Sequence, residues 1–470
     1  MMTPMTTIAI EFNDADLMAA GPDGVLGPGN NSEPGYATAN GGTPLFGRAA
    51  RCQARLRPRE THNRFWRELS SRPMAGLTGS AVTSADLVHS HLQSLWHGWS
   101  AGVSGVIFIV PAYWSQEQLG LLLGLGEELA IPVIGLVDSG VAATRCRYEV
   151  DDLLHIEASL HEIAITRMKQ GVGAAIDSRQ LIDGIGIERL ERVCVEYIAA
   201  CFLERTRFDP LHDATSEQSL YDGLYEWLRV LQRSDSVTAI LDRGDDEYNV
   251  LIERDGLFRA LASCCEPLMQ HLRSCLMTGR SVAIQITDRL ARFPGVVETI
   301  EQLPQVAVFI LEPAAAARGA LSRGVQFTRS NGGVPFKNTL RWDQPTVAVI
   351  TAEQSSQQAS MAVPTHIQHA AHIYRIGQLP VCIGSELTAG EYGIDLSADS
   401  RGISRRHCSI QIGANGVELV DHSRFGTRLN GHNINKIAVL QAGDIVSIGE
   451  PSVDLKIVAE VTAQDSGDGA

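Results

Sequence analysis

Three histidines near residue 370 are of a type that binds metals. His366, His369 and His372 recur every three residues, and imidazole nitrogens are common ligands of transition metals. We expect this segment to be one extended strand, in which His369 points away from the other two. His89 and His91 face different ways on a predicted helix and are expected at the surface. These histidines therefore predict solvated side chains and no metal site.

The other candidates for chemistry are a nucleophile and glycine-rich phosphate loops. Asp138 and Ser139 place a carboxylate beside a hydroxyl, but no histidine stands where it would complete a hydrolytic triad. The GxxxxGK[ST] phosphate loop does not occur. Gly171-Val-Gly173 and Gly184-Ile-Gly186 are incomplete dinucleotide-binding patterns that follow no clear strand. These residues predict no catalytic centre.

Charge and cysteine content restrict the partner and the compartment. The formal net charge of −15 argues against nucleic acid or an anionic membrane as the main partner. A basic stretch from Arg48 to Arg67 is interpreted as a solvated helix face or loop. We see no secretory signal and no apolar run long enough to span a membrane, and the nine cysteines are scattered. We therefore expect a soluble, cytoplasmic protein with reduced thiols.

The elements that would position these residues fall into two regions, of which the first alternates strands and helices. The apolar run Val103 to Pro111, a helical pattern from Ser115 to Ala130, and the run Ile131 to Val137 predict a parallel β-α-β unit. The same alternation returns between residues 282 and 311. Long helices are predicted at residues 181–205 and 220–232. This region is therefore expected to be an α/β body.

The second region has the pattern of an all-β domain. After a polar stretch from Thr351 to Pro364, short apolar runs alternate with turns as far as Val458. This spacing is typical of an antiparallel sandwich. Loops at one end of such a scaffold are natural binding sites, because the sheets hold them in place.

Four motifs in the second region resemble those of the forkhead-associated (FHA) domain. They are Ile383-Gly384 at the first loop, Ser404 to Cys408 (SxxHC), Asp421 to Gly431 (DxSxxGTxxNG) and Leu440 to Asp444 (LxxGD). They follow the order of the family and cover nearly all of the stretch from Ile373 to Val458. The resemblance implies a β-sandwich that binds partner proteins and is not itself an enzyme.

The same resemblance implies recognition of a phosphothreonine peptide. Ser404 would donate its hydroxyl to the phosphate, Arg405 would supply positive charge, and His407 would support the loop from behind. The family's arginine after the first glycine is Ser385 here, and its asparagine before the GT pair is Phe425, so a phosphate-independent contact surface is an open alternative. The expected peptide-binding residues are Ser385, Ser404, Arg405, Arg406, Thr427 and Asn430, and the expected structural residues are Gly384, His407, Gly426 and Gly431.

Short motifs in the body resemble those of the seventy-kilodalton heat-shock chaperone ATPases, which belong with actin and the sugar kinases. Val110 to Trp114 and Ile134 to Ala143 resemble their VPA and EPTAAA course. Arg292 to Glu298 resembles their R-x-PxV helix start, and Leu311 to Ala320 resembles their P…AVARGAA segment. The resemblance implies a two-lobed, ribonuclease-H-like fold from Thr7 to about Arg323.

This resemblance also places three nucleotide-contacting elements, and each departs from the family's pattern. The first phosphate loop falls on residues 11–14, where Asn13 replaces a glycine that lets the backbone approach phosphate. The second falls on residues 155–160, where Glu157 would repel phosphate, and the adenosine element falls on residues 288–289, whose side chains would fill the purine's space. The degenerate positions are Glu11, Asn13, Asp14, Glu157, Glu162, Asp288 and Arg289.

The expected organisation is an actin-like body at 1–323, an extension and polar linker at 324–370, an FHA domain at 371–460 and a disordered tail at 461–470. We expect a signalling adaptor or scaffold without catalytic residues, with neither ATP nor another cofactor. Its partner would be another protein, and not nucleic acid or a membrane. Two alternatives stay open: a divergent ATPase or chaperone, in which Glu11 and Glu162 hold Mg²⁺, and an actin-like filament or assembly scaffold.

Overall fold

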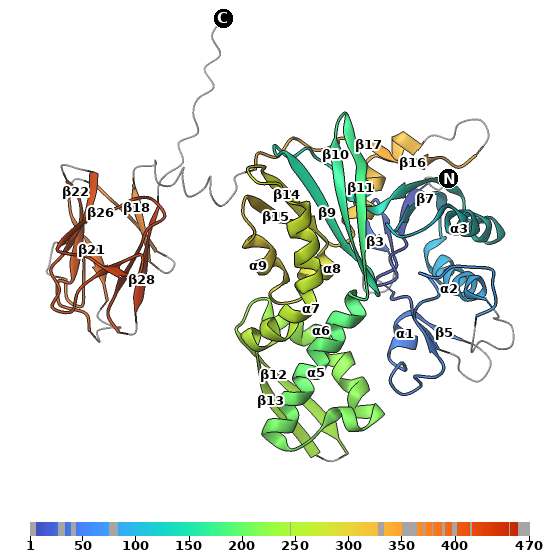
Figure 1. Ribbon diagram of the computed structural model, residues 1–470, viewed down its shortest axis with the longest axis horizontal. Helices are drawn as coiled ribbons and strands as arrows, with labels where there is room; N and C mark the ends of the chain where they lie inside the picture. Colours follow the sequence, from blue (N-terminus) through green and yellow to red (C-terminus); the bar gives the residue numbers. More distant parts are fainter. Residues whose placement is uncertain are drawn as a thin grey trace, which may run out of the picture. The chain divides into compact units, whose positions relative to one another are not determined.

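A computed structural model of the chain forms two compact units, Met1–Val349 and Ile350–Ala470 (Figure 1). Residues 351–363 of the expected polar linker and the expected tail at 461–470 lie outside the described residues. None of the helices in the described parts is long and apolar enough to cross a membrane. The described residues are 6–26, 33–38, 44–74, 83–244, 246–327, 333–349, 364–369, 372–377, 379–387, 391–396, 402–413, 416–450 and 452–458.

The first unit contains a six-stranded sheet built around its first strand, β1. Four of its strands are parallel, and β2 and β3 continue from β1 as an antiparallel meander. β1 and β7 are largely apolar and buried, as expected of strands covered on both faces. In order across the sheet the strands are β16 (Phe336–Lys337), β8 (Val133–Asp138), β7 (Val103–Val110), β1 (Thr6–Glu11), β2 (Met18–Gly21) and β3 (Gly24–Leu26).

A second six-stranded sheet in the same unit repeats the order and directions of five strands of the first, but its sixth strand is added at the opposite edge. Its first strand in the sequence, β9, again leads into an antiparallel meander on one side and pairs with parallel strands on the other. Across the sheet the strands are β15 (Val306–Ile310), β14 (Val282–Ile286), β9 (Asp152–Ala158), β10 (Glu162–Gln170), β11 (Gly173–Asp183) and β17 (Thr339–Arg341). The extension expected after residue 323 thus adds one short strand to each sheet.

Helices cover these sheets and divide the unit into two halves, each named here after its sheet. In the first half, α2 (Ser84–Trp99) and α3 (Gln116–Glu128) share a core with one face of the sheet. The short helix α4 (Ser139–Ala143) and α10 (Ala315–Ser322) share a core with the other face. A segment with α1 (Gly47–Arg51) and the small sheet of β4 (Ala37–Thr38), β5 (Leu45–Phe46) and β6 (Thr61–His62) extends this half.

The second half has its own helices and a separate hairpin. They pack into one hydrophobic core with β9 and β14, and α5 and α6 lie beyond one end of the sheet (Figure 1). The elements are α5 (Ile187–Thr206), η2 (Pro210–His212), α6 (Ala214–Leu231), β12 (Ser236–Arg243), β13 (Asp246–Glu253), α7 (Arg254–Cys275), α8 (Asp288–Ala291) and α9 (Val296–Glu301). A short turn of helix, η3 (Gly324–Phe327), follows α10.

The predicted β-α-β unit is confirmed, because β7 and β8 are parallel neighbours joined through α3. The helix predicted from residue 181 is wrong at its start. Ile182 pairs with Ile163 in the sheet, so the strand β11 continues to Asp183. Gly184 then turns the chain with a φ of +79°, and α5 begins only at Ile187. Tertiary strand pairing has overridden the helical periodicity of residues 181–186.

The second unit is a β-sandwich of two sheets around one apolar core. This confirms the predicted antiparallel sandwich. One sheet has the order β19 (His372–Arg375), β18 (His366–His369), β28 (Val453–Val458), β27 (Ile445–Ile448), β24 (Arg428–Leu429) and β25 (His432–Asn433). The other has the order β21 (Gly393–Asp395), β20 (Val381–Gly384), β22 (Cys408–Gly413), β23 (Gly416–Asp421) and β26 (Ile437–Val439).

Two histidine predictions are wrong. His369 and His372 are not on one extended strand: His369 lies in β18, His372 lies in β19, and the two are partners in an antiparallel pair. His91 is not at the surface: it is 1 % exposed, and its Nδ1 accepts a hydrogen bond from Trp66 Nε1 at 3.0 Å. Burial lowers the pKa of His91 to about 3, so the ring is neutral and serves packing.

Candidate functional site

In the second unit, two loops approach each other so closely that one position requires glycine. A Cβ on Gly384 would lie 1.9 Å from the carbonyl oxygen of Arg405. The contact continues through the amides of Ser385 and Glu386, which donate to the carbonyl oxygens of Ser404 and Arg405 at 3.1 and 3.2 Å. The first loop thereby holds the loop that carries Ser404 in place.

His407 ties the Ser404 loop to the loop that follows β23. Its Nδ1 accepts the amide hydrogen of Ser404 at 3.1 Å, so Nε2 carries the ring hydrogen and donates to Gly426 O at 3.3 Å. The side chain is fully buried, and burial lowers its pKa. His407 is thus a neutral internal connector, and it does not reach the surface where a peptide would bind.

Ser404 is partly exposed at the loop surface, and its neighbours Arg405 and Arg424 are exposed. The Oγ of Ser404 accepts the amide of Arg424 at 3.3 Å, and its own hydrogen is left to donate to a ligand. Arg405 has an 86 % exposed side chain whose Nε lies 3.2 Å from Glu386. Arg406 is turned instead toward Cys382 and Glu391. The sequence reasoning missed Arg424, although its position inside the DxSxxGT motif was a usable signal.

Two residues expected to contact a peptide are engaged inside the domain. Thr427 is fully buried and donates its hydroxyl to Asp421 Oδ1 at 2.8 Å, so its side chain is not available to a peptide. Asn430 has a φ of +50°, and its amide donates to Asp444 Oδ1 at 2.8 Å while its oxygen accepts the amide of Ile445 at 2.9 Å. Both side chains hold the turns in which they lie.

Phe425, one of the two departures from the family pattern, forms the wall of a hollow beside these loops. Its side chain is 79 % exposed, and the hollow has a volume of about 550 Å³. Arg428, Asn433 and Ser447 lie on its other sides. A hollow of this size accommodates side chains of a bound peptide.

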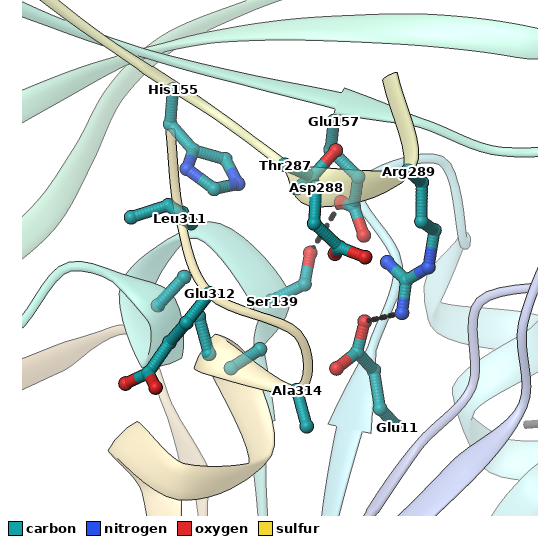
Figure 2. A pocket seen from close by; sticks show the side chains of 13 residues that line it. Glu11, Ser139, His155, Glu157, Thr287, Asp288, Arg289, Leu311, Glu312 and Ala314 are labelled. Carbon is teal, nitrogen blue, oxygen red and sulfur yellow. Dashed lines mark hydrogen bonds and ion pairs between the residues drawn. The ribbon is translucent and has the colours of Figure 1, made fainter. Parts of the chain in front are cut away.

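In the first unit, the three segments expected to contact a nucleotide converge on one small cavity (Figure 2). Glu11 at the end of β1, Glu157 in β9, and Asp288 and Arg289 in α8 line it together with Ser139. Its volume is about 10 Å³, which is room for about one water molecule. A nucleotide does not fit there in this arrangement.

The main occupant of this place is the Arg289 side chain, which is 3 % exposed. Figure 2 shows it pointing toward Glu11, with its Nη2 2.5 Å from Glu11 Oε1. Its Nε lies 3.5 Å from Asp16 Oδ2. Burial by itself would lower the pKa of Arg289, but the neighbouring carboxylates, Glu11 first among them, raise it by more. The net result is a pKa above the usual value for arginine. The guanidinium therefore carries a full charge inside the protein.

Two further carboxylates of these segments are buried and tied to backbone or polar side chains. Glu157 accepts hydrogen bonds from Asn13 Nδ2 at 3.0 Å and from Ser139 Oγ at 2.5 Å, and burial raises its pKa. Asp14 Oδ1 accepts the amide of Leu160 at 2.8 Å, while Oδ2 has no hydrogen-bond partner. Burial raises the pKa of Asp14 to about 6.

The remaining acidic position, Glu162, also faces an arginine. Its Oε2 lies 3.1 Å from Arg67 Nη2. Glu11 and Glu162, which could in principle hold Mg²⁺, are therefore each already paired with a guanidinium. Within the described ranges no three His, Cys, Asp or Glu side chains are grouped as a metal ion requires.

The basic stretch from Arg48 to Arg67 is only partly a solvated face. Arg57, Arg59 and Arg64 are exposed, as expected. Arg51, in contrast, reaches Glu191 of α5 at 2.9 Å, and the guanidinium of Arg55 lies 3.9 Å from the ring centre of Tyr221 in α6. For Arg51, Arg55 and Arg67 the predicted solvated position is therefore wrong, because these side chains bridge to the second half.

Comparison with known proteins identifies one part of the chain. The FHA domain family matches residues 381–449, which include the Ser404 loop, His407 and the GT and NG turns. This segment is an FHA domain, a protein-interaction module. No curated protein matches the chain.

Proposed function

We propose that this chain is a protein-binding adaptor whose FHA domain captures threonine-phosphorylated proteins. The observation that carries the proposal is the partly exposed Ser404, whose amide is held by His407 and whose neighbours Arg405 and Arg424 are exposed. A hydroxyl donor next to guanidinium groups is the chemistry that recognises a phosphate dianion. Arg405 and Arg424 take over the charge that Ser385 does not supply.

A binding experiment with the full chain tests phosphate recognition. A phosphothreonine peptide library should be captured, and Ser404→Ala should weaken binding about 10- to 100-fold, because a hydrogen bond to a charged group contributes about 1.5–3 kcal/mol. Ser178→Ala, at an exposed serine of β11, is the control and should bind like the wild type. Equal capture of phosphorylated and unphosphorylated peptides would replace this proposal by a phosphate-independent contact surface.

For the body we propose an actin-like ATPase fold that has lost its ATPase and presents a docking surface. Two observations support this: five strands of each sheet share the same order and directions, and the three degenerate segments meet at one cavity. The cavity is filled by Arg289 and closed by carboxylates, which repel phosphate. Calorimetry of the full chain with Mg-ATP should show no binding in the micromolar range. Tight binding, or ATP hydrolysis that disappears in Glu11→Ala, would favour the divergent ATPase instead.

A further inference from the structure

The two halves of the body meet along a line of buried charges, and Arg289 stands at its centre. Glu11 and Asp16 belong to the first half, whereas Arg289 comes from α8 of the second half. The side chains of Arg289 and Glu11 are 3 % and 4 % exposed, and Asp16 is 17 % exposed. Their charges are thus largely removed from water, and each depends on the others for compensation.

We propose that Glu11 and Asp16 form a cation-binding site that the protein fills with its own Arg289 guanidinium, and that this internal ligand holds the two halves closed. A planar guanidinium can contact two carboxylates at once. The ammonium of a lysine, a single charge at the end of a flexible chain, cannot do this with the same geometry. In Arg289 one terminal nitrogen faces Glu11 and the Nε faces Asp16. Arg292 adds a second contact to Asp16 at 3.4 Å.

Contacts around this site act in the same sense, because each joins one half to the other. Asn13 of the first half donates to Glu157 and to the carbonyl oxygen of Ala158 in β9. The bridges of Arg51 to Glu191 and of Arg67 to Glu162 run from the first half to the second. Several contacts therefore hold the two halves together without a nucleotide. Among the described residues, Arg289 is the only one of these side chains that neutralises Glu11.

The inference does not depend on phosphopeptide capture or on the ancestry of the fold. It requires only that a cation between Glu11 and Asp16 is needed for closure. All six tryptophans lie in the first unit, so intrinsic fluorescence of the full chain follows the body and not the FHA domain. A failure in this test is thus distinguishable from a failure of phosphopeptide binding.

The test is chemical rescue of Arg289→Ala. We expect this variant to melt at a lower temperature than the wild type, and amide hydrogen exchange in β1 and α8 to become faster together. Methylguanidinium at low millimolar concentration should restore both, while methylammonium at the same ionic strength should not. The control is Arg318→Ala, which removes an exposed partner of Glu312 and should gain nothing from methylguanidinium. An unchanged melting temperature, or no difference between the two added cations, overturns the proposal.

A second variant keeps the proposal testable if Arg289→Ala does not fold. Glu11→Gln combined with Arg289→Gln removes both charges and keeps a polar side chain at each position. If the unpaired Glu11 carboxylate is what disrupts the single variant, the double variant should fold and melt at a higher temperature than the single one. If the double variant fails equally, Arg289 acts only by filling space and the cation site is refuted.

Discussion

The buried carboxylate of Asp14 gives the body a pH dependence that one substitution should remove. Its pKa rises from 3.8 to about 6 on folding, chiefly because burial disfavours the charged form. The folded state therefore binds the proton more tightly than the unfolded state does. The ionised side chain costs about 3 kcal/mol of stability at neutral pH, and this cost disappears as the pH falls below the unfolded pKa.

Asp14→Asn preserves the oxygen that accepts the Leu160 amide and removes the titration. The free energy of unfolding should be measured by urea denaturation of the full chain, followed by tryptophan fluorescence. Between about pH 7.5 and about pH 4.5 the wild type should gain about 2 kcal/mol relative to Asp14→Asn. The Asp14 carboxylate helps to raise the pKa of the His161 imidazole, so the measured difference includes the change at His161.

The matched control is Asp23→Asn, at an exposed carboxylate in the turn between β2 and β3. Its stability should follow that of the wild type across the whole pH range. If the curves of wild type and Asp14→Asn run parallel with pH, the carboxylate is not held in an environment that disfavours its charge. The reasoning from burial would then be refuted.

Three further substitutions test packing around the two sites. Gly384→Ala should destabilise the FHA domain by about 3 kcal/mol or more, because a Cβ would lie 1.9 Å from a carbonyl oxygen, whereas Gly377→Ala, with nothing within 4 Å, should change it by less than about 0.5 kcal/mol in calorimetry. Thr427→Val should cost about 1–3 kcal/mol in the same assay, because Asp421 loses its buried donor. Arg323 is 1 % exposed and donates hydrogen bonds to main-chain carbonyl oxygens at the ends of α4 and α10. Arg323→Met should therefore destabilise the body by about 3 kcal/mol, measured by tryptophan fluorescence.

Local motifs were sufficient to predict the FHA domain and several of its loop contacts. Gly384 and His407 carry this information because a close backbone approach and a buried connector each demand one residue type. For Thr427 the motif marks the residue but does not say whether its side chain faces outward or into the core. Only the hydrogen bond to Asp421 decided that.

In the body, the sequence determined the parallel β-α-β unit and the non-glycine residues at positions 11–14 and 155–160. Both features can be read from a short stretch of sequence, because apolar periodicity and the identity of a single residue do not depend on distant segments. The closed charge network was decided only by the tertiary structure. Arg289 meets Glu11 across 278 positions of sequence, and the arginines after Arg48 divide between solvent and the second half. The partner of a buried charge depends on which segments the fold brings together, and no local pattern encodes that.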